Sequence, residues 1–212
     1  MAASVAVQAG VRPKVELVAS PAMCQHAFDC IRAELANAPQ PLPPYPVDGA
    51  SAPLFVTFDR MAHGRASLRG CIGTLSPTSL SQVGYYAKRS AFKDRRFTPI
   101  EAGELPSLRV GVSLLVSYEK AQDAFDWNID QHGIIIEFTD STGRAYSATY
   151  LPHVAKEQGW DHEQALQNLV KKSGYTGKLS MQQLRNIGTT RYQSSKARMT
   201  YAEYIKLTKQ TG

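Results

Sequence analysis

The sequence predicts an α/β fold of the α+β type, in which a mainly antiparallel sheet is flanked by helices and two lobes enclose a cleft. Apolar residues alternate with smaller or polar ones along several short segments, which is typical of strands that bury one face. Turn-forming residues separate consecutive segments of this kind, as expected between antiparallel neighbours. Other segments repeat apolar residues at helical spacing after a capping residue, which predicts amphipathic helices.

The first elements expected along the chain are a helix and a hairpin. Ser20-Pro21 sets a capping serine before a proline at the first helical position, and apolar residues then recur at helical spacing as far as Leu35. Residues 39–53 hold half of the prolines, which indicates an extended connector on the surface. Residues 54–58 predict a strand, and His63-Gly64 predicts a turn into a second strand around residue 71.

The middle of the chain is expected to add a helix and three strands. Ser76-Pro77 predicts a helix start, followed by a buried stripe of Leu80, Val83, Ala87 and Ala91. Alternation over residues 110–116 predicts a strand. The apolar run 134–136 and the segment 144–150 predict two more strands, joined by the turn 140–143.

A last helix is expected from its end signals. Asp161 and Gln164 have the spacing of a capping box, and Leu166, Leu169 and Val170 supply an apolar face. The sequence Lys-Lys-Ser-Gly at 171–174 adds a cationic last turn and a glycine stop. We therefore expect one domain over residues 20–208, with an N-terminal extension at 1–19 and a tail at 209–212.

Composition excludes several classes of protein. The three cysteines are odd in number and form no Cys-x-x-Cys pair, so neither a disulfide framework nor a cysteine zinc site is indicated. No apolar run approaches the length needed to cross a bilayer, and the N-terminus lacks the pattern of a secretion signal. We expect an intracellular protein of the cytoplasm or nucleus, or of both, without a membrane partner.

Positive charge is concentrated near the C-terminus. From Lys171 onward the chain has nine lysines and arginines against Glu203 alone, so this segment has a net charge of +8. The whole chain has a net charge of +6, so the residues before Lys171 carry −2. Such asymmetry can mark contact with an acidic protein surface or with nucleic acid. A solvated surface is the more ordinary interpretation, since the chain contains no nucleic-acid-binding motif.

Residues 68–75, Leu-Arg-Gly-Cys-Ile-Gly-Thr-Leu, are the main functional candidate. In a regular strand Arg69 and Cys71 would project together, roughly 7 Å apart, and the guanidinium would favour a thiolate. Gly70 and Gly73 would mark a bulge or a close approach of a ligand or of another backbone segment, and we take both as candidate binding residues. The competing interpretation is that Cys71 is a small core residue, since free cysteine is often buried.

Four further residues are candidates. His132 precedes a predicted strand, where it would face a cleft as an acid or base or form a hydrogen-bonded turn. Asp94 would orient a catalytic partner or pair with neighbouring arginines. Arg191 and Tyr192 offer a cation and an aromatic face to a small anionic or planar ligand, although a simple strand accounts for them equally well. The histidines form no short ligand pair, so no metal site is predicted.

Residues 68–75 also resemble the signature of the AMMECR-one (AMMECR1) domain family. Similar blocks follow in the family's order over roughly residues 20–208: 86–99, 112–115, 132–138, 148–152, 157–160 and 190–194. Where the family usually has a glutamate after Leu-Pro, this chain has His153. The resemblance implies a two-lobed α+β fold but no agreed reaction.

Two main functions remain open. The first is a regulatory interaction module, in which the strand around Cys71 builds a groove for a partner protein and the basic C-terminal region steers that partner. The alternative is an enzyme with Cys71 as nucleophile or redox thiol, assisted by Arg69, His132 and Asp94. Prokaryotic relatives occur beside Memo-like and radical-SAM proteins, so the resemblance implies a linked modification step for this alternative. Direct nucleic-acid binding is a weaker third possibility, and neither substrate nor cofactor is predicted.

Overall fold

The computed structural model describes residues 17–210. Within this range the chain forms one curled six-stranded sheet, with strand order β2-β1-β3-β6-β4-β5 and antiparallel pairing throughout. Helices pack against the sheet, so the α+β prediction is confirmed. The expected cleft between two lobes stays a prediction. Most of the expected N-terminal extension, residues 1–16, and the end of the expected tail, 211–212, lie outside the described residues.

The first helix and the first hairpin form as expected. Helix α1 spans Pro21–Leu35, with Ser20 at the cap position and Cys24 fully buried. Strands β1 (Ser51–Ala62) and β2 (Arg65–Ser79) pair as a long hairpin. His63 and Gly64 join them with positive φ angles of 50° and 73°, the backbone of a tight hairpin turn.

The predicted helix start at Ser76-Pro77 is wrong. Strand β2 continues to Ser79, because Thr78 and Ser79 pair with Ala52 and Ser51 at the start of β1. Pro77 lies where the register shifts, so its missing N–H removes no ladder bond. A short 3₁₀ turn at Leu80–Gln82 then leads into helix α2, Val83–Phe92. The predicted stripe is buried, with Leu80 in the turn and its other three residues in α2.

The remaining elements follow a 3₁₀ segment, η2, at Ala102–Ser107. They are β3 (Leu108–Lys120), β4 (Gly133–Thr139), β5 (Ala145–Tyr150), α3 (Val154–Gln158), α4 (His162–Lys172), α5 (Met181–Arg185), β6 (Gly188–Thr200) and α6 (Tyr201–Gln210). The capping box of α4 is confirmed, since Asp161 accepts from Gln164 N–H and Gln164 accepts from Asp161 N–H.

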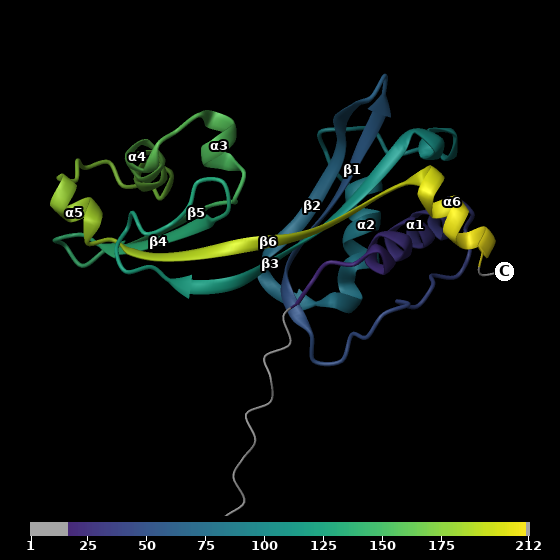
Figure 1. Cartoon of the computed structure of the whole chain (residues 1–212), viewed down its shortest axis with the longest axis horizontal. Coiled ribbons are helices and arrows are strands. Elements are labelled where there is room, and N and C mark those ends of the chain that lie inside the picture. The colour runs from purple at the N-terminus through teal and green to yellow at the C-terminus, as the bar shows by residue number, and fades with distance from the viewer. Residues whose placement is uncertain (1–16, 211–212) are drawn as a thin grey trace, which may run out of the picture.

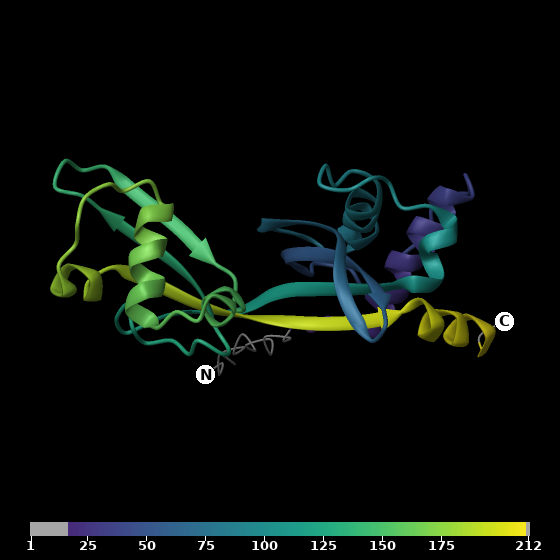
Figure 2. The same cartoon turned by 90° about the horizontal axis from the view of Figure 1, so that it is seen from above.

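Strands β3 and β6 span the molecule and connect its two hydrophobic cores. Figure 1 shows α1, α2 and α6 at one end, α3, α4 and α5 at the other, and these two strands running between them. Figure 2 shows the same extended strands from above. One core, which we call the α1 core, includes Phe28, Phe58 and Val112, and the other, the α4 core, includes Ile136 and Leu166. No helix within residues 17–210 is long and apolar enough to cross a membrane.

The part of the sheet formed by β2, β1, β3 and β6 has one face buried against the α1 core and one open face. Val56 of β1, Val112 of β3 and Ala197 of β6 point into the core. Their neighbours point the other way, and one row of them crosses all four strands: Cys71, Thr57, Gly111 and Arg198 follow one another in register from β2 to β6. Gly111 has no side chain, which leaves space above the open face at this point of the row.

Gly70 is required by the approach of α2 to β2. A Cβ at this position would overlap the backbone carbonyl of Ser90. The helix consequently packs directly against the strand, and the Ser90 hydroxyl donates to Val56 O at 2.7 Å and accepts from Ile72 N at 2.8 Å. Gly73 is confined in the same way by the Leu54 carbonyl of β1.

We expect Gly70→Ala to lower the free energy of unfolding by about 3 kcal/mol, since α2 must move away from β2 to admit the methyl group. Urea denaturation followed by circular dichroism measures this. Gly111→Ala is the matched control, because its Cβ would meet the nearest atom at 3.6 Å, an ordinary contact. Equal stabilities of the two variants would contradict the close approach.

Candidate functional site

A cavity of about 610 Å³ lies over the open face of the sheet. Its floor comes from β1, β2, β3 and β6, and the segment Leu151–His153 between β5 and α3 adds a wall. Polar and charged side chains surround it. They are Thr57, Asp59, Cys71, Arg96, Ser113, His153, Glu157, Ser194, Lys196 and Arg198. The volume is within the range of ordinary ligand sites.

Cys71 is half-buried in this cavity, and its main chain is held from the side by two charged residues. Its N–H donates to Asp94 Oδ2 at 2.9 Å, and its carbonyl accepts from Arg96 Nη2 at 3.2 Å. Asp94 and Arg96 thereby occupy the hydrogen-bonding positions that another strand would use at this sheet edge. The Cys71 thiol accepts a hydrogen bond from Thr57 Oγ1 at 3.1 Å.

Asp94 is ionised because of this arrangement. Two nitrogens of Arg96 donate hydrogen bonds to its carboxylate, Nε at 3.0 Å and Nη2 at 2.7 Å. This ion pair and the N–H of Cys71 hold the pKa of Asp94 well below its usual range, against the opposing effect of burial. The expectation that Asp94 pairs with a nearby arginine is confirmed, and its carboxylate serves the backbone of Cys71 rather than the thiol.

The Arg69 side chain does not lie beside the Cys71 thiol, so the expected thiol–guanidinium pair is wrong. Phe58 pairs with Gly70 and Asp59 with Leu68, which leaves Arg69 as the extra residue of a β-bulge. The bulge reverses the alternation, so that Leu68 and Cys71 line the cavity together. Arg69 is buried elsewhere and binds both oxygens of Glu104 at 2.8 Å, and this lowers the pKa of Glu104 to about 2.

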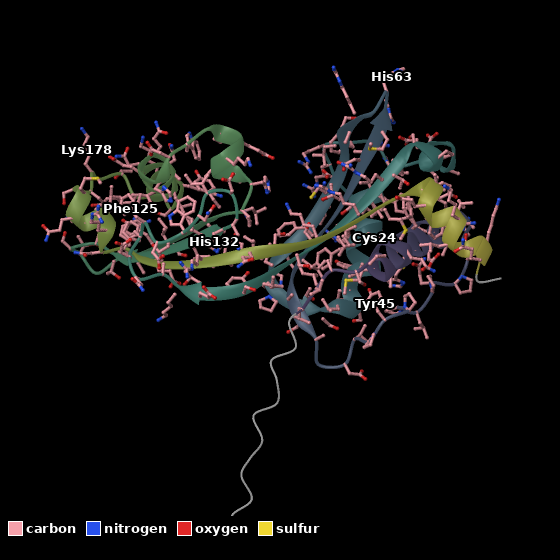
Figure 3. All side chains as sticks on the ribbon, viewed as in Figure 1. Cys24, Tyr45, His63, Phe125, His132 and Lys178 are labelled. Carbon is pink, nitrogen blue, oxygen red and sulfur yellow. The ribbon has the colours of Figure 1, made fainter. Side chains whose placement is uncertain are left out.

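His132 lies outside the Cys71 cavity. Its Nδ1 accepts from Asn128 N–H at 2.9 Å, which makes it a hydrogen-bonded turn residue. Burial and the charge of Arg191 lower its pKa, so the ring is neutral near pH 7. In Figure 3 it lies on the Phe125 side of the molecule, at the end opposite Cys24. The four candidate catalytic residues are thus not brought into one site.

Arg191 and Tyr192 make structural contacts in the part of β6 that lies at the α4-core end of the molecule. Arg191 forms ion pairs with Glu119 at 3.0 Å and with Asp126 at 2.7 Å. Tyr192 is 1% exposed and donates its hydroxyl proton to the Tyr150 carbonyl at 3.1 Å. Both side chains have partners within the protein, which agrees with the simple strand interpretation, and a ligand for them stays a prediction.

Comparisons with known proteins identify the family. The AMMECR1 family model matches residues 24–197. The chain belongs to the AMMECR1 family. An uncharacterised Arabidopsis thaliana protein is 45% identical over 192 residues, which cover 89% of this chain and 89% of that protein. An uncharacterised Schizosaccharomyces pombe protein is 44% identical, covering 73% and 79%.

A solved AMMECR1-like structure agrees with this fold. The crystal structure of an uncharacterised Pyrococcus horikoshii protein matches 83% of this chain and 88% of its own, with a TM-score of 0.58 and 26% sequence identity. These AMMECR1 relatives bear uncharacterised names, so the family supplies a fold and no specific activity. Within residues 17–210, no cluster of three or more His, Cys, Asp or Glu side chains is arranged to hold a metal ion.

Sequence reasoning missed several residues of the AMMECR1 cavity. Lys196 and Arg198 alternate with the buried Ala197 and Met199, and this period of two is the signal that would have identified β6 and its open face. Arg96 had no such periodic signal, because it lies in the loop after α2 and contacts Cys71 from that loop. His153, noted as a departure from the family pattern, lines the cavity, where burial and the charge of Lys196 lower its pKa.

We expect Asp94→Asn to reduce stability by about 2 kcal/mol at pH 7, through weaker hydrogen bonds to Arg96 and Cys71. Because folding depresses the pKa of Asp94, its contribution is present above about pH 4 and is lost as the pH falls further. Urea denaturation at several pH values should show the two proteins converge in acid. Asp48→Asn, at an exposed position, is the control. A difference that is constant with pH would contradict the assignment.

We also expect Cys71 to be the cysteine that alkylating reagents modify first. Cys24 and Cys30 are at most 3% exposed, and burial raises the pKa of each thiol to about 11. Iodoacetamide at neutral pH should therefore label Cys71 at least about tenfold faster, as measured by peptide mass spectrometry. Labelling in denaturant, where the three rates should be similar, provides the reference. Equal rates in the folded protein would show that the cavity does not expose Cys71.

Proposed function

We propose that this protein is an intracellular regulatory interaction module that docks a partner protein in the Cys71 cavity. The observation that carries the proposal is the open sheet face, a preformed hollow with Gly111 in its floor and both apolar and charged side chains in its lining. Protein interfaces commonly surround an apolar centre with a polar rim, and Phe55, Leu68, Leu115 and Leu151 supply apolar surface here. Three free cysteines are in keeping with a reducing compartment.

Local geometry favours docking over catalysis by Cys71. No histidine in the described part of the chain hydrogen-bonds the thiol, and its hydrogen-bond donor is the neutral Thr57 hydroxyl. The guanidinium of Arg69 is engaged by Glu104. An activated cysteine needs a base or a nearby cation directed at the sulfur. Arg96 is directed instead at the Asp94 carboxylate and the Cys71 carbonyl.

The basic C-terminal residues do not form one steering surface. Lys171 and Lys172 are in α4 and Arg185 is in α5, whereas Lys206 and Lys209 belong to α6 at the other end of the molecule. Of the nine, Lys196 and Arg198 line the cavity. We therefore assign the electrostatic contribution to partner binding to these two residues.

We expect Gly111→Leu to abolish partner binding without unfolding the protein. Its side chain would extend from the cavity floor, and its Cβ meets no atom closer than 3.6 Å. Affinity purification from the host cell extract, with quantitative mass spectrometry, should show proteins that bind the unaltered chain and are lost with this variant. Complexes rebuilt from purified components then confirm direct binding.

Gly103→Leu is the matched control, because its Cβ would meet nothing within 4 Å at an exposed site outside the cavity. Partners should persist with this variant. Recovery of the same proteins by the Gly111→Leu chain would refute docking in the cavity. Selective loss of turnover in an activity screen, with all partners retained, would favour the enzyme alternative.

A further inference from the structure

Two cations of the cavity lie side by side on β6. Lys196 and Arg198 are two residues apart in a strand, so they project from the same face, and they pair with Ser113 and Gly111 of β3. Both are exposed, and both line the cavity. The small residues opposite them leave room for a ligand above the strand.

Unlike neighbouring cations, Lys196 and Arg198 have no carboxylate partner among residues 17–210. Arg109 pairs with Asp59 at 2.8 Å, and Arg96 pairs with Asp94 at 2.7 Å. Among residues 17–210, neither Lys196 nor Arg198 has an ion-pair partner within 4 Å. Two adjacent positive charges without counterions favour an anionic ligand.

Ser194 extends the same row. It is two residues before Lys196, it lines the cavity, and its Oγ is buried with no hydrogen-bond partner in the part of the chain that the structure describes. A buried hydroxyl without a partner is unfavourable, and a ligand oxygen in the cavity would satisfy it. Successive members of the row are roughly 6.6 Å apart along the strand, the spacing of alternate side chains in an extended peptide.

The lining of the cavity suits a peptide better than nucleic acid, because part of it is apolar. Phe55, Leu68, Leu115 and Leu151 add apolar surface that suits peptide side chains. A segment with alternating acidic and apolar residues matches both the two cations and this apolar surface.

We propose that the cavity binds an extended acidic segment of a partner protein, whose alternate carboxylates pair with Lys196 and Arg198. This inference depends on the proposed docking function and adds the chemistry of the docked segment. Ser194 donates its hydroxyl proton to an oxygen of the same segment. The peptide lies along β6, over the open face, and does not add a strand to the sheet edge.

The test uses the full chain labelled with ¹⁵N and the peptide Leu-Glu-Leu-Glu-Leu, acetylated and amidated so that only its side chains are charged. We expect NMR shifts around residues 194–198 on titration. Leu-Gln-Leu-Gln-Leu should cause none. Changing both cations, as Lys196→Gln with Arg198→Gln, should weaken binding about tenfold.

Lys178→Gln is the control for net charge. Lys178 is an exposed lysine at the end of the molecule away from the β1–β2 hairpin (Figure 3), and its loss should leave the affinity unchanged. Equal binding of the two peptides, or no binding at concentrations that NMR detects, would overturn the inference. So would preferential binding of an oligothymidine that weakens steeply with salt.

Failure of the proposed acidic segment can be distinguished from failure of the proposed docking function. If the peptide fails to bind while Gly111→Leu still loses its partners, the acidic segment is refuted and docking in the cavity stands. If the peptide fails and Gly111→Leu retains every partner, both the segment and the docking function are refuted.

Discussion

The contact on which the candidate site depends is the direct approach of α2 to β2. Gly70 removes the side chain that would separate the two elements, and Ser90 then hydrogen-bonds to both strands of the hairpin. This contact places the last turn of α2 beside β2, and Asp94 and Arg96 follow in the loop directly after the helix. Those two residues hold the N–H and the carbonyl of Cys71. Helix packing on the opposite face of the sheet thus positions the two residues that hold the main chain of Cys71.

Elements with local signals could be predicted from the sequence. The α1 start, the hairpin turn and the α4 capping box depend on residues within a few positions of one another, and each forms as expected. The helix start at Ser76-Pro77 has the same local signal and is wrong, because pairing with the beginning of β1 outweighs it. Long-range strand pairing is invisible to a local pattern.

The candidate site was predictable in part for the same reason. The motif around Cys71 identified the correct strand, but ideal alternation placed Arg69 beside the thiol, and a single bulge reversed this. His132 belongs to a turn near the other core. Lys196 and Arg198 are over a hundred residues away from Cys71 in sequence, and they reach the cavity through β3 and β6. No spacing within the motif carries that information.

The bulge at Arg69 also determines where the chain can change length during evolution. Arg69 is the extra residue of β2, so deleting it would restore a regular ladder, leave Cys71 opposite Thr57 and remove the buried ion pair with Glu104. The hairpin tip at His63 and Gly64 is exposed and packs on nothing that the site requires. Insertions are therefore expected at the tip among relatives, whereas the interval from Leu68 to Cys71 should keep a constant length.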